Sequence, residues 1–140
     1  MIDIDKRILE TSIEIGEAAG FQIRLVKDQR YFWLLVIPLI DGVHEWHDLA
    51  PDMHATSTRL VRHLAAGVKQ ATGAERMNVA AIGNVVPMLH IHIVARSPGD
   101  MHWPQPIWGQ GKPEPLSKIE EAWRAAVCRD LLTTFGEGAS

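Results

Sequence analysis

The stretch LHIHIVAR, residues 89–96, alternates histidines with large apolar side chains. Side chains on a β-strand point alternately to opposite faces, so His90 and His92 are expected to share one face, with Cα atoms about 6.5–7 Å apart. Their aliphatic neighbours are then expected to enter a core on the other face: Leu89, Ile91 and Ile93. Two imidazoles on one strand could bind a metal, act on a phosphate, or be polar residues on an open sheet face.

The composition is typical of one soluble globular domain. The chain has 140 residues, of which 46% are hydrophobic and 22% charged. A net charge of −3 gives no general electrostatic reason to bind nucleic acid. No apolar run reaches the roughly 18–20 residues of a membrane span, and the N-terminus lacks the apolar core of a signal peptide. The single cysteine, Cys128, cannot form an intrachain disulfide, which favours a reducing compartment. Together these features lead us to expect a cytoplasmic protein without a membrane partner.

Hydrophobic periodicity predicts an α+β domain with an antiparallel sheet. Four segments have the apolar or alternating pattern of strands: 21–26, 31–37, 77–82 and 89–95. The segment 97–115 contains five prolines and three glycines, so it is expected to be a loop.

Three segments are expected to be helices. The first is weakly amphipathic and covers residues 4–18, with Ile4, Ile8 and Ile15 on one side. The second is capped by Asp52 and stopped by Gly73. The third covers about 117–135, opens on the capping-box pattern Ser117-x-x-Glu120, and is expected to bury one face: Ile119, Trp123, Val127 and Leu131.

Metal and serine or cysteine chemistry find little support in the residue pattern. A metal site needs a third and usually a fourth ligand, but no carboxylate follows His92 until Asp100. Cys128 lies on a predicted helix and is expected to be an inert buried thiol. No nucleophile elbow or phosphate-binding glycine loop occurs. We therefore expect no metal and no cofactor, and note that a neutral histidine can itself be the nucleophile.

The run NVAAIGNVVPMLHIHIVAR, residues 78–96, is followed by His102-Trp103-Pro104. Together they resemble the histidine triad (HIT) superfamily of nucleotidyl hydrolases and transferases, whose signature is His-φ-His-φ-His-φ-φ, where φ is apolar. The upstream run WLLVIP, residues 33–38, is similar to the strand that precedes the family's first long helix. The resemblance covers roughly residues 21–108. It implies one HIT-like domain over residues 1–140, with about five antiparallel strands and flanking helices, that forms a homodimer.

The resemblance implies a nucleotide phosphohydrolase that acts on nucleoside phosphoramidates or dinucleoside polyphosphates. His90 would form a covalent nucleotidyl-histidine, and His92 would donate to the phosphate oxygens. Four further residues would bind the nucleotide: Asn78, Asn84, Val85 and Trp103. Two alternatives remain open: a nucleotidyl transferase with the same histidine chemistry, and a catalytically weakened nucleotide-binding regulatory module.

Two positions depart from the family pattern. Methionine occupies the first triad position, residue 88, and Trp33 aligns with a fourth histidine that many members carry. The chain resembles a bacterial subgroup in which the first triad histidine is replaced. We expect Met88 to pack against Trp33, so that an apolar pair replaces a polar relay.

Overall fold

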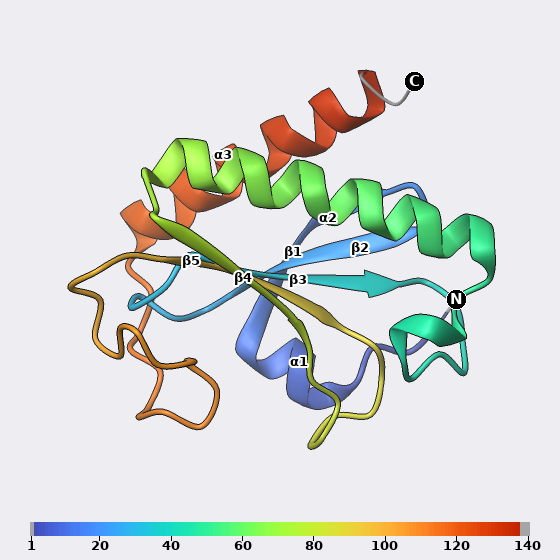
Figure 1. Ribbon diagram of the computed structural model, residues 1–140, viewed down its shortest axis with the longest axis horizontal. Helices are drawn as coiled ribbons and strands as arrows, with labels where there is room; N and C mark the ends of the chain where they lie inside the picture. Colours follow the sequence, from blue (N-terminus) through green and yellow to red (C-terminus); the bar gives the residue numbers. More distant parts are fainter. Residues whose placement is uncertain (1, 138–140) are drawn as a thin grey trace.

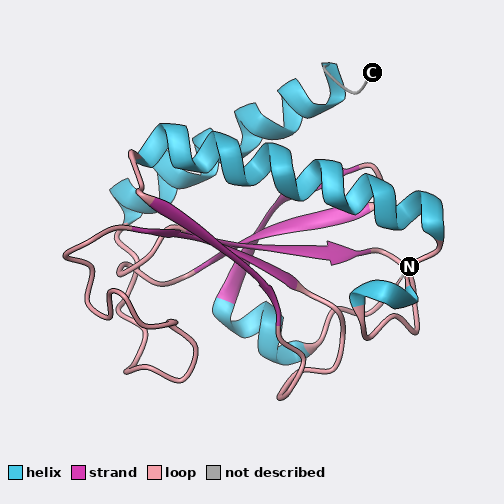
Figure 2. Ribbon diagram, in the orientation of Figure 1, coloured by secondary structure: helices cyan, strands magenta, loops and turns pink. Residues whose placement is uncertain are grey.

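The computed structural model describes residues 2–137 and shows a five-stranded antiparallel sheet in the order β1-β2-β3-β5-β4 (Figures 1 and 2). The α+β class and the antiparallel sheet are as the sequence predicts. The strands are β1 Ser12–Ala18, β2 Phe21–Val26, β3 Trp33–Pro38, β4 Arg76–Ala81 and β5 Ile91–Arg96. The helices are α1 Lys6–Thr11, the 3₁₀ turn η1 Trp46–Asp48, α2 Pro51–Thr72 and α3 Lys118–Glu137. Residues 1 and 138–140 of the expected domain lie outside the described part.

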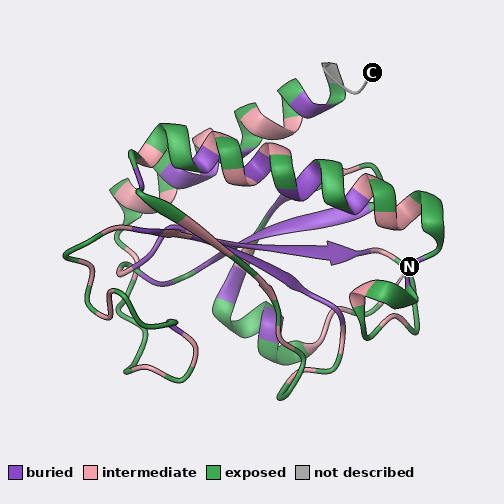
Figure 3. Cartoon of the chain, viewed as in Figure 1, coloured by how far each residue is buried: buried purple, intermediate pink, exposed green. Residues whose placement is uncertain are grey.

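Helices α2 and α3 cover one face of the sheet, and the main core lies between them and the strands (Figures 1 and 3). It contains Leu89, Ile91 and Ile93, as the alternating pattern of residues 89–96 predicts. The two helices approach closely at Gly67, where a Cβ atom would collide with the side chain of Leu131. Glycine at this position therefore lets α3 pack against α2.

The other face of the sheet carries two smaller coverings. At one end α1 packs its Ile8 on a cluster with Val26, Leu35 and Ile37. At the other end the loop after β5 packs Ile107 and Trp108 near Val94. The histidine pair belongs to this face. His92 is paired with Leu35 of β3 and Ala80 of β4, and paired residues of neighbouring strands point to the same face of the sheet.

The expected helix over residues 4–18 is wrong for most of its length. Only α1 is helical, with Asp5 as its N-cap, and the chain continues as β1. Two β-branched residues of this strand, Ile13 and Ile15, suit a strand as well as a helix, and pairing with β2 decides the outcome. A register shift between Glu14 and Gly16 bends the strand under α3, where a Cβ at Gly16 would lie 3.1 Å from Leu132.

Helix α2 ends as expected but starts differently. Gly73 closes it in the left-handed conformation, with φ of 70°. Its N-cap is Ala50 rather than Asp52, because Pro51 occupies the first helical position, where its missing N–H is no loss. Asp52 lies in the first turn, where its negative charge suits the helix dipole.

Helix α3 buries the predicted face only in part: Val127 and Leu131 pack against the core, but the two predicted residues nearer the start of the helix are exposed. Ile119 is 85% exposed and Trp123 is 42% exposed. The most deeply buried residues of the helix are Arg124, Ala125, Cys128 and Phe135. Arg124 is drawn in because its guanidinium reaches three backbone carbonyls of the turn between β2 and β3. Cys128 is buried as expected, and burial raises the pKa of its thiol to about 12, which leaves it unreactive.

The capping box at the start of α3 is half formed. The Ser117 hydroxyl accepts the amide of Glu120 at 3.1 Å. The Glu120 carboxylate does not return the bond, because it accepts the guanidinium of Arg124 at 3.0 Å.

Candidate functional site

The two histidines lie side by side on the sheet face opposite α2 and α3. His92 is in β5, and His90 directly precedes that strand. Their ring centroids are 4.8 Å apart at an interplanar angle of 65°. Both are largely covered, with 7% and 6% of their surfaces exposed. The prediction that they share one face is confirmed.

His90 is oriented by the backbone of residue 88. Its Nδ1 lies 2.7 Å from the carbonyl oxygen of Met88. A carbonyl can only accept, so Nδ1 carries the proton and the lone pair of the neutral ring is at Nε2. Within residues 2–137, that Nε2 has no hydrogen-bond partner. A neutral imidazole with a free Nε2 lone pair has the form of a nucleophile or general base.

His92 is held by Trp33, whose indole Nε1–H donates to His92 Nδ1 at 3.0 Å. Burial, with a smaller contribution from neighbouring His90, lowers the pKa of His92 to about 3. The ring is therefore neutral at ordinary pH. The expectation that Trp33 is an apolar replacement is wrong, because its indole N–H is bonded to His92.

Met88 and Trp33 border the same apolar cluster, formed by Ile8, Val26, Leu35 and Ile37. The side chain of Met88 thus faces an apolar surface, as expected for a thioether. The contact of Met88 with His90 is made by its backbone carbonyl.

Trp108 is a third aromatic residue of the site, and it comes from the loop after β5. Its ring meets His92 edge-on at 5.3 Å between centroids and meets Trp33 in the same manner at 6.5 Å. The indole N–H of Trp108 is buried and has no partner in the part of the chain that the structure describes. Loop conformation, which no local pattern encodes, decides which of several tryptophans reaches the histidines.

Two predicted nucleotide-binding residues, Asn78 and Trp103, contact Arg96 instead of the histidine pair. The Asn78 side-chain oxygen accepts from Arg96 at 3.0 Å, and the guanidinium lies 5.9 Å from the centre of the Trp103 ring. Arg96 also forms a buried ion pair with Asp100 at 2.8 Å. Arg96 lies four positions along the strand from His92, which is about 13 Å. This group anchors the loop after β5.

The other two predicted residues, Asn84 and Val85, are exposed in the loop between β4 and β5. The Val85 carbonyl accepts the guanidinium of Arg7 at 2.9 Å, and Arg7 also pairs with Asp5, so this loop is tied to α1. Among the described residues, the backbone amides of 83–85 donate to no protein acceptor. Backbone N–H groups free in this way can bind a phosphate.

Beside His90 lies a cavity of about 10 Å³, enough for roughly one water molecule. Its lining comes from the segments before η1 and before β5: His44, Glu45, Ala81, Ile82, Gly83, Met88, Leu89 and His90. His44 is fixed there by a contact of 3.1 Å between its Nδ1 and the Pro87 carbonyl.

Over residues 2–137, no three side chains among His, Cys, Asp and Glu come together as a possible metal site. In the same range no helix has the length and apolarity to cross a membrane.

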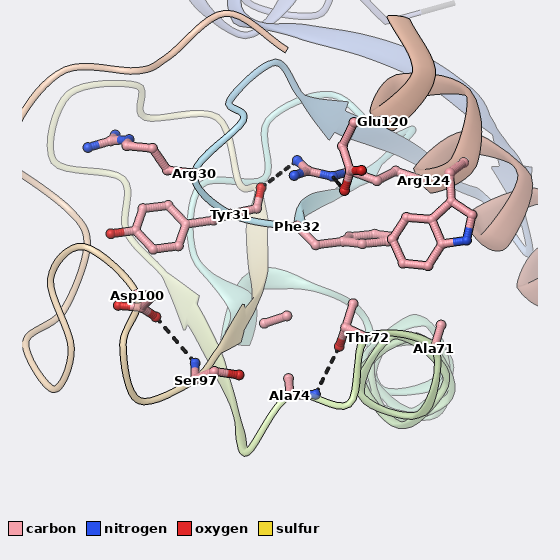
Figure 4. Close-up of a pocket in the computed structure, with 12 residues that line it drawn as sticks. Arg30, Tyr31, Phe32, Ala71, Thr72, Ala74, Ser97, Asp100, Glu120 and Arg124 are labelled. Atoms are coloured by element: carbon pink, nitrogen blue, oxygen red, sulfur yellow. Dashed lines mark hydrogen bonds and ion pairs between the residues drawn. The ribbon is translucent and has the colours of Figure 1, made fainter. Parts of the chain in front are cut away.

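A larger hollow of about 320 Å³ lies near the start of α3 (Figure 4). Its lining includes Phe32, Trp123 and Ala95 together with charged groups of α3 and the loops. The charged groups are already paired: Arg124 with Glu120, and Arg30 with Asp28. It offers surface but no free titratable group.

Comparison with known proteins identifies the family of the chain. The model of the HIT domain family matches residues 13–99. A histidine triad (HIT) protein from Sinorhizobium meliloti is 40% identical, with 93% of this chain and 96% of that chain covered and a TM-score of 0.89.

Two further solved structures are similarly close. A histidine triad protein from Bradyrhizobium japonicum is 32% identical, covers 93% and 97% of the two chains and has a TM-score of 0.90. One from Marinobacter aquaeolei is 30% identical, covers 96% and 98%, and has a TM-score of 0.92. No curated protein matches the chain. The family model and these relatives, which span nearly the whole length, show that the chain belongs to the histidine triad family.

Proposed function

We propose that the protein is a nucleotide phosphohydrolase of the histidine triad type, with nucleoside phosphoramidates or dinucleoside polyphosphates as substrates. One observation carries the proposal: the Nδ1–H of His90 donates to the Met88 carbonyl, which leaves the Nε2 lone pair free beside a second imidazole. The loss of the first triad histidine does not remove this orientation, because a backbone carbonyl supplies it. In keeping with its family, the protein would act as a homodimer in the cytoplasm.

In the proposed reaction, His90 Nε2 attacks the α-phosphorus, an N–P bond forms, and the bond from phosphorus to the leaving group breaks. The leaving group takes a proton from the solvent, and the attacking water of the second step returns one to the solvent, so the protons balance over the cycle. Water then attacks the same phosphorus, the N–P bond breaks, and the nucleoside monophosphate leaves with His90 neutral again. His92 would donate to a phosphate oxygen throughout and stabilise the charge that develops in each transition state.

The phosphate would lie between the histidine pair and the loop of Asn84 and Val85, whose free amides can donate to it. Trp108, which touches His92, would border this subsite. Asn78 and Trp103 would contribute indirectly, through Arg96 and the loop it anchors.

The test is mass spectrometry of the intact protein after incubation with adenosine 5′-phosphoramidate and with diadenosine tetraphosphate. A mass increase of one nucleotidyl group, mapped to His90 and absent in His90→Ala, is expected. His63→Gln is the matched control, because His63 lies between α2 and α3, bonded to the Leu131 carbonyl at 2.8 Å. Nucleotide binding without any adduct or turnover would favour the regulatory module instead.

The acceptor is identified by turnover in ¹⁸O-labelled water. Label in the released monophosphate shows hydrolysis. Turnover that requires an added phosphate or alcohol acceptor, with no label in the product, would show the transferase alternative.

A further inference from the structure

The structure assigns Trp33 a role as a positioning residue: it holds His92 with its ring proton on Nε2, while the Met88 carbonyl holds His90 in the opposite tautomer. This inference rests on the proposed function for its catalytic meaning. The tautomers themselves are a property of the unliganded protein and can be measured without any substrate.

The contact between Trp33 and His92 has only one possible donor. An indole nitrogen carries a hydrogen and has no lone pair to offer, so it donates and never accepts. At 3.0 Å from Trp33 Nε1, the Nδ1 of His92 is therefore the acceptor. The single ring proton of neutral His92 is then on Nε2.

His90 faces an acceptor where His92 faces a donor. A backbone carbonyl accepts and never donates, so the 2.7 Å contact with Met88 places the proton of His90 on Nδ1. Two adjacent imidazoles thus have opposite tautomers because one faces a pure donor and the other a pure acceptor. The Nε2 of His90 therefore carries a lone pair, whereas the Nε2 of His92 carries a hydrogen.

Tryptophan at position 33 fixes the direction of this hydrogen bond in a way that histidine would not. A histidine side chain could donate to His92 or accept from it, because either ring nitrogen can hold the proton. Tryptophan removes that choice. Its ring is also fixed, since Trp33 meets the edge of Trp108 and borders the cluster under α1. The departure from the family pattern therefore makes the donor role of His92 independent of a second titratable group.

Trp108 provides an internal control for this assignment. Its ring is 5.3 Å from that of His92, slightly closer than the 5.7 Å of Trp33. Its N–H, however, forms no bond within residues 2–137. Both indoles thus pack on the same imidazole, and only Trp33 can set its tautomer.

The experiment is ¹⁵N-detected imidazole NMR of the unliganded protein near neutral pH. We expect His90 as the Nδ1–H form and His92 as the Nε2–H form, with a coupling across the hydrogen bond between Trp33 Nε1 and His92 Nδ1. In Trp33→Phe the His92 signals should shift toward a mixture of tautomers, and in Trp108→Phe they should stay as in the wild type. A wild-type His92 protonated on Nδ1, or unchanged tautomers in a folded Trp33→Phe, would overturn the assignment.

Kinetics then connect the tautomer with the reaction. Trp33→Phe is expected to lower kcat at least about tenfold while KM changes by less than about threefold, because an imidazole in the wrong tautomer fails mainly in the transition state. If the NMR result holds and the wild type has no turnover, the proposed function fails and the tautomer assignment stands. If Trp33→Phe does not fold, the wild-type spectrum alone decides the assignment.

Discussion

The histidine site and the hollow near the start of α3 differ in one respect that matters for chemistry. Both combine aromatic rings with ionisable side chains. In the hollow, Arg124 donates to Glu120 and to the Tyr31 carbonyl (Figure 4). It also donates to the carbonyls of Asp28 and Gln29, and Arg30 is paired with Asp28. At the histidine site each ring has one nitrogen bonded to protein and the other free among the described residues.

This difference separates a structural network from a reactive site. Buried charges whose hydrogen-bonding capacity is satisfied stabilise a geometry, but they have nothing left to offer a substrate. An imidazole that is fixed through one nitrogen keeps the other for chemistry. The larger volume of the hollow is therefore a poor guide to function, and the small cavity beside His90 marks the more informative region.

The largest expected effect comes from His90→Ala. Loss of the nucleophile should reduce kcat by about 10⁴-fold or more, with nucleotide affinity nearly unchanged, because the group acts in bond making rather than in ground-state binding. Steady-state kinetics and equilibrium nucleotide binding measure both quantities. Trp123→Ala, in the hollow, is the matched control and should retain turnover. Equal losses in the two variants would erase the distinction between the two regions.

The next largest expected effect is a loss of stability caused by a substitution in the hollow. Arg124→Met should lower the free energy of unfolding by about 3–5 kcal/mol, because three buried carbonyls and Glu120 lose their donor. Urea denaturation measures the change, and Arg129→Met, an exposed arginine of the same helix, is the control. Turnover per folded molecule should persist. A stable Arg124→Met variant without activity would show that the hollow takes part in the reaction.

A smaller effect concerns the charge of His92. Its pKa is about 3 in the folded protein against an ordinary value of 6.5, so below pH 6.5 the unfolded chain binds a proton that the folded chain does not. The free energy of unfolding should therefore fall as pH decreases from 6.5 toward 3, by up to about 1.4 kcal/mol per pH unit from this group.

Urea denaturation between pH 6.5 and 5 tests this, because carboxylates titrate little there. The measured slope should be smaller in His92→Gln by the contribution of this one histidine. Identical slopes in the two proteins would mean that His92 is protonated as readily in the folded state as in the unfolded one.

Local pattern was a good guide where burial repeats along the chain, and a poor guide where a distant segment decides. The alternation around His90 and His92 was enough to place both rings on one face, and the HIT signature identified the family. The local pattern could not show that β1 would form from Ser12 onward, because the strand that pairs with it, β2, lies in another segment. Nor could it rank Trp103 and Trp108, since the path of a long loop determines which one reaches His92.

The smallest expected effect answers why methionine can stand at position 88. Its carbonyl orients His90, and any residue supplies a carbonyl, whereas its side chain only borders an apolar cluster. Met88→Leu should therefore change kcat by less than about twofold and stability by less than about 1.5 kcal/mol, as volume-conserving swaps usually do. Met88→His should destabilise by about 1–3 kcal/mol without raising turnover, because its polar atoms would face that cluster unsatisfied. Kinetics and urea denaturation of both variants decide the matter: a gain in turnover on restoring histidine would show that the side chain, and not the carbonyl alone, once served the reaction at this position.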